Sequence, residues 1–330
     1  MTVQITRRRL ITVAAAAAGL PLLLKATGAQ ARMVTWEGTT LGAPSSIKLF
    51  ATDEAKARTA IQAALAELER LEGIFSVYRA DTAISRLNRE GKLDDAPADF
   101  VALLEKSLDL ARISGGRYDP TIQPVWQTYF RHFTAANPDP NGPAQRDLDA
   151  ALALVGWQNV EISGKRVAFT KPDMGLTLNS GAQGFITDKV TEVLRSHGFD
   201  RMLVDMGEPR ALSTRPDGTA WRIGIANPAD PSQAVTEIDV VDKAISTSGG
   251  YGTLFDAEGR FTHLIDTKTG TTAPALLGVS VVADTATIAD GLSTALLMTP
   301  AERQHDVLTQ AGGLMALTVT PQGVVGKVEA

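Results

Sequence analysis

The order in which helical and strand-like segments follow one another most limits what this chain can fold into. Apolar residues recur with helical spacing over residues 53–71 and 99–113, and an amphipathic segment at residues 185–197 ends at Gly198. Strand-like segments are mixed among these helices without the regular alternation that builds a doubly wound parallel sheet. The sequence therefore predicts an α+β fold of mixed sheets with packed helices.

Shorter patterns indicate the remaining elements. Residues 134–147 are rich in Pro, Asn, Asp and Gly and are expected to form an exposed loop, whereas residues 115–122 are expected to turn from a helix end into a strand. Helices are also predicted at residues 147–155, 284–298 and 301–311. Strands or hairpins are predicted at residues 38–50, 160–162, 166–169, 201–206, 221–226, 235–241, 244–247, 261–265, 276–283, 314–320 and 324–328.

The N-terminus has the pattern of an export signal. Thr6-Arg7-Arg8-Arg9 precedes an apolar run at residues 11–24, and Ala29-Gln30-Ala31 has the form of a cleavage site. A lipid anchor or an uncleaved membrane segment is the alternative, but the chain has no Cys, and the run is shorter than the roughly 20 residues of a membrane span. We predict a twin-arginine signal peptide at residues 1–31, one domain at residues 32–330 and a periplasmic location.

Composition excludes several kinds of site and partner. Without Cys, the chain has no disulfide, no thiolate metal site and no Cys nucleophile. Its four histidines are scattered, so we expect any metal to be bound by oxygen atoms. Signal cleavage would remove four positive charges and change the formal net charge from −5 to −9. An acidic protein of this kind is not expected to bind nucleic acid.

One carboxylate lies inside an apolar segment near the C-terminus. Asp290 comes four residues before Thr294 in the run Ala289-Asp290-Gly291-Leu292-Ser293-Thr294-Ala295, so on a helix the two side chains share one face. Their oxygens could bind one hard cation such as Mg²⁺. A core Asp satisfied by the protein itself, or an Asp facing solvent, explains the same pattern and is the more common case.

Two other segments could contact a ligand. The small residues at 178–185 lead into a helix, which suits a phosphate group but also an ordinary turn. Tyr78 comes just before a short helix for which Asp81 or Thr82 is a natural N-cap. Its ring could stack on a flat ligand, although a half-buried structural tyrosine is more common.

Two further segments, one around Gly116 and one around His263, also allow both a functional and a structural interpretation. Gly116 permits a close approach of a ligand, and Asp119 is held extended by Pro120, yet turn chemistry alone accounts for both. His263 is expected in an alternating strand, three residues before Asp266. Histidine is the usual general base near neutral pH, but a lone histidine in a strand is more often structural.

The order of these segments is more specific than any one of them. The series is Tyr78-Arg79-x-Asp81-Thr82-x-Ile84-Ser85-Arg86-x-Asn88, Gly116-x-Tyr118-Asp119-x-Thr121, the loop at residues 179–184 with Asp188, Thr247-Ser248-Gly249, His263-x-Ile265-Asp266-x-x-Thr269-Gly270 and Ala289-Asp290-x-x-Ser293-Thr294-Ala295. In this order the segments resemble the ApbE family, the FAD:protein FMN transferases. The resemblance covers nearly all of the chain after the signal.

The resemblance implies a fold with the ligand site in a central cleft and a Mg²⁺-dependent reaction. FAD is cut at its pyrophosphate, FMN is attached through its phosphate to a Thr or Ser hydroxyl of a target flavoprotein, and AMP is released. Motif matching assigns His263 as the base or as a phosphate-positioning residue. The metal ligands implied are the Ser180 carbonyl, Asp290, Ser293 and Thr294, and the FAD contacts implied are Tyr78, Arg117, Tyr118, Asp119, Thr177, Gln183 and Ile265.

The chain departs from the family pattern at four places, one of which is Asp266-Thr267 where the family's H-I-I-D-P has D-P. In the loop that the family writes D-L-G-G-I-A-K-G, Thr177 replaces the Asp, Asn179-Ser180 the Gly pair and Gln183 the Lys. The family's G-G-D is here Gly207-Glu208-Pro209. Its M-G-T is matched to Glu37-Gly38-Thr39, which predicts the loss of an apolar contact to the ligand.

The combination of L-N-S-x-A-Q-G, G-E-x-R-A and a twin-arginine signal resembles a subgroup, NosX. Its members accompany nitrous oxide reductase and flavinylate that enzyme's membrane partner, NosR, so a membrane-bound NosR-like acceptor is implied. Two alternatives remain open: a FAD pyrophosphatase, which differs only in its acceptor, and a non-catalytic periplasmic flavin-binding or assembly protein, which the altered loop at residues 177–183 favours.

Overall fold

The computed structural model describes residues 31–227, 230–272 and 275–330. The predicted signal peptide lies outside the described residues, apart from Ala31. The strands are β1 (Arg32–Thr40), β2 (Ala43–Ala51), β3 (Lys92–Leu93), β4 (Val160–Ser163), β5 (Arg166–Phe169), β6 (Met202–Asp205), β7 (Pro209–Leu212), β8 (Trp221–Asn227), β9 (Asp230–Val240), β10 (Ala244–Gly249), β11 (Gly278–Ala283), β12 (Gly313–Val319) and β13 (Val325–Glu329).

The helices are α1 (Glu54–Phe75), α2 (Ala83–Glu90), α3 (Ala98–Ile113), α4 (Gln123–Phe133), α5 (Gln145–Leu152), α6 (Asn179–Ser196), α7 (Ala286–Met298) and α8 (Ala301–Gln310), with short 3₁₀ turns at Pro120–Ile122 and Trp157–Asn159. Within residues 31–227, 230–272 and 275–330, none of the helices is long and apolar enough to cross a membrane.

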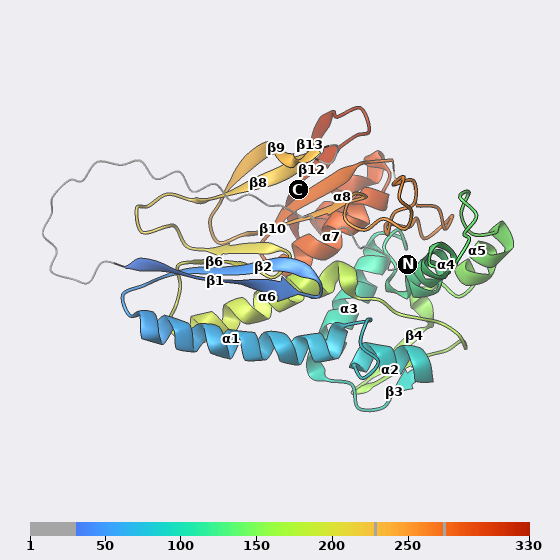
Figure 1. Cartoon of the computed structure of the whole chain (residues 1–330), viewed down its shortest axis with the longest axis horizontal. Helices are drawn as coiled ribbons and strands as arrows, with labels where there is room; N and C mark the ends of the chain where they lie inside the picture. The colour runs from blue at the N-terminus through green and yellow to red at the C-terminus, as the bar shows by residue number, and fades with distance from the viewer. Residues whose placement is uncertain (1–30, 228–229, 273–274) are drawn as a thin grey trace, which may run out of the picture.

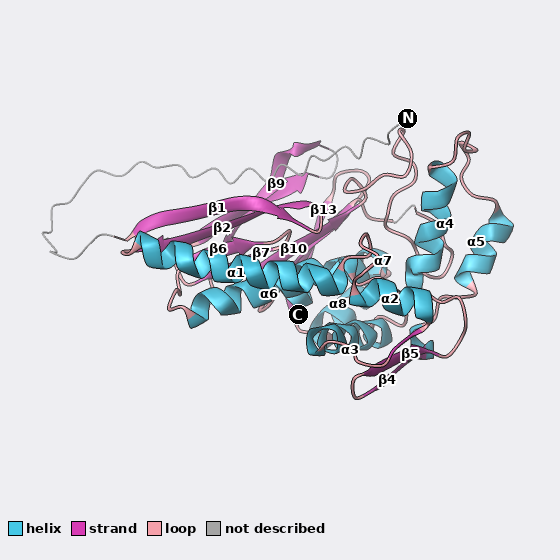
Figure 2. Ribbon diagram, turned by 60° about the horizontal axis from the view of Figure 1, so that its bottom comes forward, coloured by secondary structure: helices cyan, strands magenta, loops and turns pink. Residues whose placement is uncertain are grey.

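A large antiparallel sheet organises the molecule (Figure 1). It has eight strands in the order β1-β2-β6-β7-β10-β11-β12-β13, and its neighbours pair antiparallel. A three-stranded sheet, β3-β5-β4, and the β8–β9 hairpin complete the strands. Figure 2 shows α1 and α6 running along the sheet, whereas α4 and α5 lie together at one end. The α+β prediction is confirmed.

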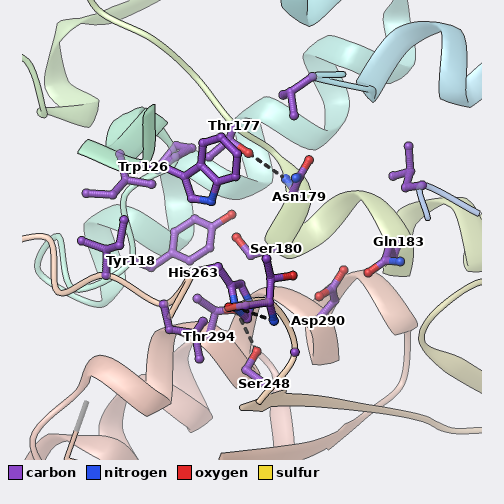
Figure 3. Close-up of a pocket in the computed structure, with 18 of the residues that line it drawn as sticks. Tyr118, Trp126, Thr177, Asn179, Ser180, Gln183, Ser248, His263, Asp290 and Thr294 are labelled. Atoms are coloured by element: carbon purple, nitrogen blue, oxygen red, sulfur yellow. Dashed lines mark hydrogen bonds between the residues drawn. The ribbon is translucent and has the colours of Figure 1, made fainter. Parts of the chain in front are cut away.

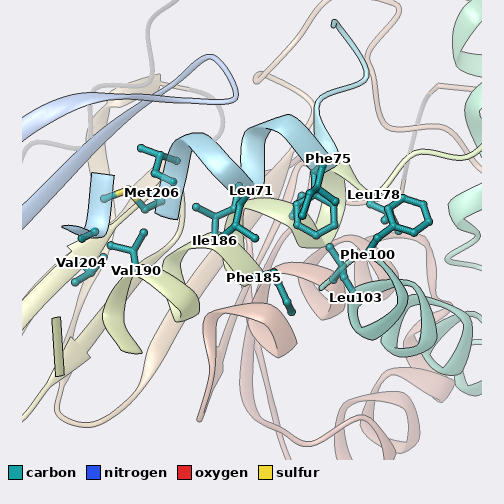
Figure 4. Packing of buried hydrophobic residues seen from close by; sticks show 14 of the residues in the cluster. Leu71, Phe75, Phe100, Leu103, Leu178, Phe185, Ile186, Val190, Val204 and Met206 are labelled. Carbon is teal, nitrogen blue, oxygen red and sulfur yellow. The ribbon is translucent and has the colours of Figure 1, made fainter. Parts of the chain in front are cut away.

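The main core lies between α1, α6 and the strands β1, β2 and β6. The apolar stripes of the two helices face this core, Val204 of β6 packs into it, and so does Met206 just after that strand (Figure 4). Phe75 packs edge-on against Phe185, with ring centroids 5.6 Å apart. Each fully buried side chain of this size stabilises the fold by about 1.5–3 kcal/mol, so the core holds α6, and hence the residues at its N-terminus, in one position on the sheet.

Two local predictions were wrong around residues 115–122 and 261–265. No strand follows Gly116, because the Asp119 carboxylate caps a 3₁₀ turn by accepting from the Thr121 N–H, and Pro120 at the first helical position leads into α4. His263 lies in a loop and not in an alternating strand. Only an isolated bridge between Leu254 and Thr262 is present there.

Aromatic packing explains that loop. Phe255 and Phe261 turn toward Tyr129 and Phe133 of α4, with ring centroids 5.0–6.4 Å apart. This cluster holds the backbone in a compact loop, and its side chains cannot alternate across a sheet. The strand β7, the short strand β3 and the helix α4 were not predicted. The remaining elements agree with prediction apart from their ends: α6 begins at Asn179 and not at residue 185, and Thr82, not Asp81, caps α2.

Candidate active site

One pocket gathers nearly all of the predicted site residues (Figure 3). Its cavity volume is about 290 Å³, and it lies among the N-terminal end of α6, one face of α7, the start of α4 and the loop that holds His263. Every predicted site residue except Ser293 lines it, namely Tyr78, Arg117, Tyr118, Asp119, Thr177, Ser180, Gln183, His263, Ile265, Asp290 and Thr294. The six short motifs, which are separate along the sequence, thus come together at one place in the fold.

The pocket depends on a very close approach of α6 and α7. A Cβ on Gly184 would lie 2.2 Å from the carbonyl oxygen of Ala286 and 2.8 Å from Cβ of Asp290, so only glycine fits there. The Gly184 backbone N–H donates to Asp290 Oδ2 at 2.9 Å. This contact aims the carboxylate at the N-terminal turn of α6.

Three oxygen donors from these two helices come together. Asp290 is 4% exposed, and Thr294 lies one turn later on the same face, as its spacing predicts. Ser180 has φ −85° and ψ 29°, outside the helical region, which kinks the first turn of α6. Its carbonyl oxygen faces α7, because it lies 3.7 Å from the place of a Cβ on Gly291. A carboxylate, a carbonyl and a hydroxyl therefore border one part of the pocket.

Ser293 is buried and does not line the pocket. Its Oγ donates to the Asp290 carbonyl oxygen at 2.9 Å and shares a 2.7 Å hydrogen bond with Ser248 Oγ. Ser248 in turn bonds Thr294 Oγ1 at 2.9 Å and does line the pocket. Ser248 was not among the predicted site residues, although the Thr247-Ser248-Gly249 motif carried the signal. Ser248 orients the hydroxyl of Thr294.

A buried ion pair fixes the start of α7. The Asp188 carboxylate on α6 accepts from the backbone N–H groups of Ala286 and Thr287 at 3.0 and 2.9 Å. It also accepts from Arg210 Nη1 of β7 at 2.7 Å, and both side chains are at most 14% exposed. A carboxylate at a helix N-terminus is favourable because it meets unpaired N–H groups and the positive end of the helix dipole. Asp188 thus ties α6, α7 and β7 together behind the pocket.

The wall that carries Tyr118 and Asp119 is buried and polar. Burial raises the pKa of the Tyr118 phenol, whose hydroxyl donates to Ser107 Oγ at 3.4 Å. Burial also raises the pKa of the Asp119 carboxyl, although that group accepts from Thr121 and from the Trp157 N–H at 3.0 Å. Asp119 therefore forms hydrogen bonds within the protein and also lines the pocket.

Charged and aromatic side chains border the opening. Arg117 Nη1 pairs with Asp266 Oδ2 at 3.3 Å, which joins the Tyr118 wall to the histidine loop. Tyr78 is 67% exposed at the rim, whereas Ile265 is buried. An exposed tyrosine ring at a pocket rim is free to lie against a flat ligand.

His263 is held through one ring nitrogen. Its Nδ1 lies 3.1 Å from the Thr253 carbonyl oxygen and 3.3 Å from the Thr253 N–H nitrogen. When Nδ1 carries the proton and donates to the carbonyl, Nε2 is the basic nitrogen. The loop therefore orients the imidazole within the pocket lining, as a general base requires.

The altered loop forms the first turn of α6. Thr177 Oγ1 accepts from the Asn179 N–H at 3.3 Å, and Gln183 Nε2 donates to the Thr40 carbonyl oxygen at 3.5 Å. Both residues keep their places in the pocket lining although they differ from the family pattern.

The β1–β2 turn, and not Glu37-Gly38-Thr39, reaches the pocket. Glu37 and Thr39 are exposed on β1, whereas Leu41, Gly42, Ala43 and Pro44 line the cavity. Leu41 and Gly42 have φ values of 47° and 88°, as a two-residue hairpin turn requires. Leu41 thus places an apolar side chain in the pocket lining, near where the sequence predicted that an apolar contact is lost.

The oxygen donors fit a hard cation that also binds phosphate. Mg²⁺ is commonly held by one or two carboxylates together with phosphate oxygens and water. Among residues 31–227, 230–272 and 275–330, no group of three His, Cys, Asp or Glu side chains could hold a metal. A smaller set of oxygen ligands is formed by Asp290, Thr294 and the Ser180 carbonyl. It leaves most coordination positions of a cation to the atoms of a bound ligand.

Comparison with known proteins agrees with this fold and site. The sequence model of the ApbE family matches residues 41–318. The FAD:protein FMN transferase of Vibrio cholerae is 29% identical over 289 residues, which cover 86% of this chain and 86% of that protein. The Haemophilus influenzae FAD:protein FMN transferase is 27% identical over 330 residues, with 94% of each chain covered.

Solved structures give the same result. The flavin transferase ApbE from Vibrio cholerae has a TM-score of 0.78 at 26% identity and covers 91% of this chain and 97% of its own. The Pseudomonas stutzeri flavinyl transferase ApbE has a TM-score of 0.77 at 28% identity, with 91% and 95% covered. The fold and its oxygen-lined cleft define an enzyme of the flavin transferase class. The chain belongs to the ApbE family.

Proposed function

We propose that this protein transfers FMN from FAD to a Thr or Ser hydroxyl of a target flavoprotein and releases AMP. The observation that carries the proposal is the pocket itself, which unites Tyr78, Tyr118, His263 and Asp290 from four separate motifs. The relatives named FAD:protein FMN transferase cover most of this chain and support the same activity.

The chain's own residues would bind Mg²⁺ at the junction of α6 and α7. The protein ligands would be Asp290, Thr294 and the Ser180 carbonyl. A cation held by them would supply neutralisation of the pyrophosphate charge. The contacts from Gly184 to Asp290 and from Ser248 to Thr294 hold two of these ligands in place.

His263 acts as the general base for the acceptor hydroxyl. The hydroxyl oxygen attacks the phosphorus on the FMN side of the pyrophosphate, and the bond from that phosphorus to the bridging oxygen breaks. AMP leaves with the bonding electrons, and the hydroxyl proton passes to Nε2 of His263. The Thr253 backbone, which fixes Nδ1, keeps Nε2 basic for this transfer.

The acceptor and the location are proposed from the sequence. Arg7-Arg8-Arg9 and the apolar run that follows support export by the twin-arginine route to the periplasm. The altered Gln183 and Glu208 segments resemble the NosX pattern, which supports a membrane-bound, NosR-like flavoprotein as the acceptor.

One experiment separates transfer from its alternatives. The mature chain is incubated with FAD and Mg²⁺, with and without a Thr-containing acceptor flavoprotein. A fluorescent protein band that requires the acceptor indicates transfer, free FMN without it indicates a pyrophosphatase, and intact bound FAD indicates a non-catalytic protein. The Asp290→Ala variant should stay folded and lose cleavage and transfer. An undiminished rate in that variant would refute the metal site.

A further inference from the structure

Four hydroxyl groups lie together where α7 packs against β10. Ser293 and Thr294 belong to α7, and Ser246 and Ser248 belong to β10. Ser246 and Ser293 are at most 1% exposed, whereas Ser248 and Thr294 line the pocket (Figure 3). Three of them, Thr294, Ser248 and Ser293, are joined by hydrogen bonds into what we call the hydroxyl chain. It leads from a pocket-lining residue to a fully buried one.

The hydroxyl chain ends at a backbone carbonyl, which fixes the direction of its hydrogen bonds. Ser293 Oγ lies 2.9 Å from the Asp290 carbonyl oxygen, and a carbonyl oxygen can only accept. The one proton of the Ser293 hydroxyl is used there, so Ser293 accepts from Ser248 Oγ at 2.7 Å. The Ser248 proton is used in turn, so Ser248 accepts from Thr294 Oγ1 at 2.9 Å.

This direction decides which side of the Thr294 hydroxyl faces the pocket. Its proton points toward Ser248, and its lone pairs are left for the pocket. A hydroxyl binds a cation through a lone pair, whereas a proton directed at the cation would repel it. The buried hydrogen bonds therefore orient Thr294 as an acceptor toward the pocket.

We infer that Ser293 is a positioning residue for the proposed cation site. Its hydrogen bond to the Asp290 carbonyl oxygen holds the Ser248 and Thr294 hydroxyls in the orientation that a cation requires. Ser293 thus acts on the cation through these two hydroxyls and does not touch it, which agrees with its place outside the pocket lining. The inference rests on the proposed function, because it takes Thr294 as a cation ligand.

Binding of Mn²⁺, which substitutes for Mg²⁺ and is detected by electron paramagnetic resonance, tests the inference in the mature protein with FAD present. Ser293→Ala leaves the Ser248 proton able to turn toward Thr294, so the variant should bind Mn²⁺ about tenfold or more weakly. Ser248→Ala removes the acceptor of the Thr294 proton and should weaken Mn²⁺ binding by a similar factor.

Ser246→Ala is the matched control. Ser246 is as buried as Ser293, and its Oγ contacts Ser293 Oγ at 3.3 Å, but it lies outside the hydroxyl chain. Its removal leaves the Ser293 proton on the Asp290 carbonyl oxygen, so the affinity for Mn²⁺ should stay that of the wild type. Thermal unfolding checks that each variant is folded.

A double-mutant cycle separates positioning from a general loss of packing. Thr294→Val keeps the shape of the side chain and removes the hydroxyl, so Ser293 has nothing left to orient. In that background Ser293→Ala should cause no further loss of Mn²⁺ affinity, whereas an effect of packing would be the same in both backgrounds.

Three results would count against the inference. Wild-type Mn²⁺ affinity in Ser293→Ala, or an equal loss with and without the Thr294 hydroxyl, would overturn it while wild-type transfer of FMN continued. Wild-type protein that bound no Mn²⁺ would also overturn it, and if that protein transferred no FMN either, the proposed function would fail as well.

Discussion

Gly184→Ala tests whether the close approach of α6 and α7 builds the active site. The new Cβ would lie 2.2 Å from the Ala286 carbonyl oxygen, whereas ordinary van der Waals contact begins at 3.4 Å. Because that atom belongs to the backbone, no side-chain rotation relieves the clash. The helices must therefore separate by roughly 1 Å, since a close-packed interior has no space to absorb the methyl group.

The expected cost follows from two opposing terms. Overpacking of a core by a methyl group costs about 1–3 kcal/mol. Replacing a mid-helix glycine by alanine stabilises a helix by about 0.5–1 kcal/mol. The net loss should be about 1–2 kcal/mol in the free energy of unfolding. A displacement of roughly 1 Å between Asp290 and Ser180 should also slow FMN transfer by about 100-fold.

Gly73→Ala is the matched control. Gly73 lies inside α1, and a Cβ there would meet no atom within 4 Å. This variant should gain about 0.5–1 kcal/mol and transfer FMN normally. Guanidinium unfolding and in-gel flavin fluorescence measure the two effects. If Gly184→Ala were as stable as Gly73→Ala and equally active, the argument that helix contact positions Asp290 would be wrong.

Three further predictions concern single side chains. Asp188→Asn leaves the buried Arg210 guanidinium without its anion and should cost about 3–5 kcal/mol in urea unfolding; a loss below about 1 kcal/mol would contradict the ion pair's role. Burial raises the pKa of Asp119, so the stability it contributes is present below the ordinary carboxyl pKa and is lost as pH rises through the raised value. Asp119→Asn should therefore weaken the fall in stability with rising pH, measured by urea midpoints from about pH 3 to about pH 8, and parallel curves would refute this. His263→Ala should still bind FAD in a fluorescence titration but lose transfer, and lost binding or unfolding would instead indicate a structural role.

Local spacing predicted the elements that hold the site. The helix at residues 284–298 and the shared face of Asp290 and Thr294 are confirmed, because the helical period alone decides which side chains lie together. The capped helix after Tyr78 is confirmed for the same reason, since the Thr82 hydroxyl accepts from the Ser85 N–H.

Long-range packing decided what the local pattern could not. Residues 261–265 alternate like a strand, yet Phe261 belongs to the aromatic cluster on α4, and tertiary contact overrode the pattern. The helix α4 was missed because the Asp119-Pro120 pair, which caps the 3₁₀ turn that leads into it, was interpreted only as an extended turn. The tripeptide Glu37-Gly38-Thr39 was matched too early by four residues, because the hairpin turn at Leu41 is set by strand register.

The amino-acid sequence by itself determined the α+β class, the absence of thiol chemistry, the family and eleven residues of the pocket lining. Those properties follow from residue types and their order along the chain. Only the tertiary structure decided how the lining is used. The contact of Gly184 with Asp290 joins residues that are 106 positions apart, and the Gln183 side chain lies against the Gly207 backbone. Such contacts depend on how α6, α7 and β7 pack, and packing is a property of the folded chain alone.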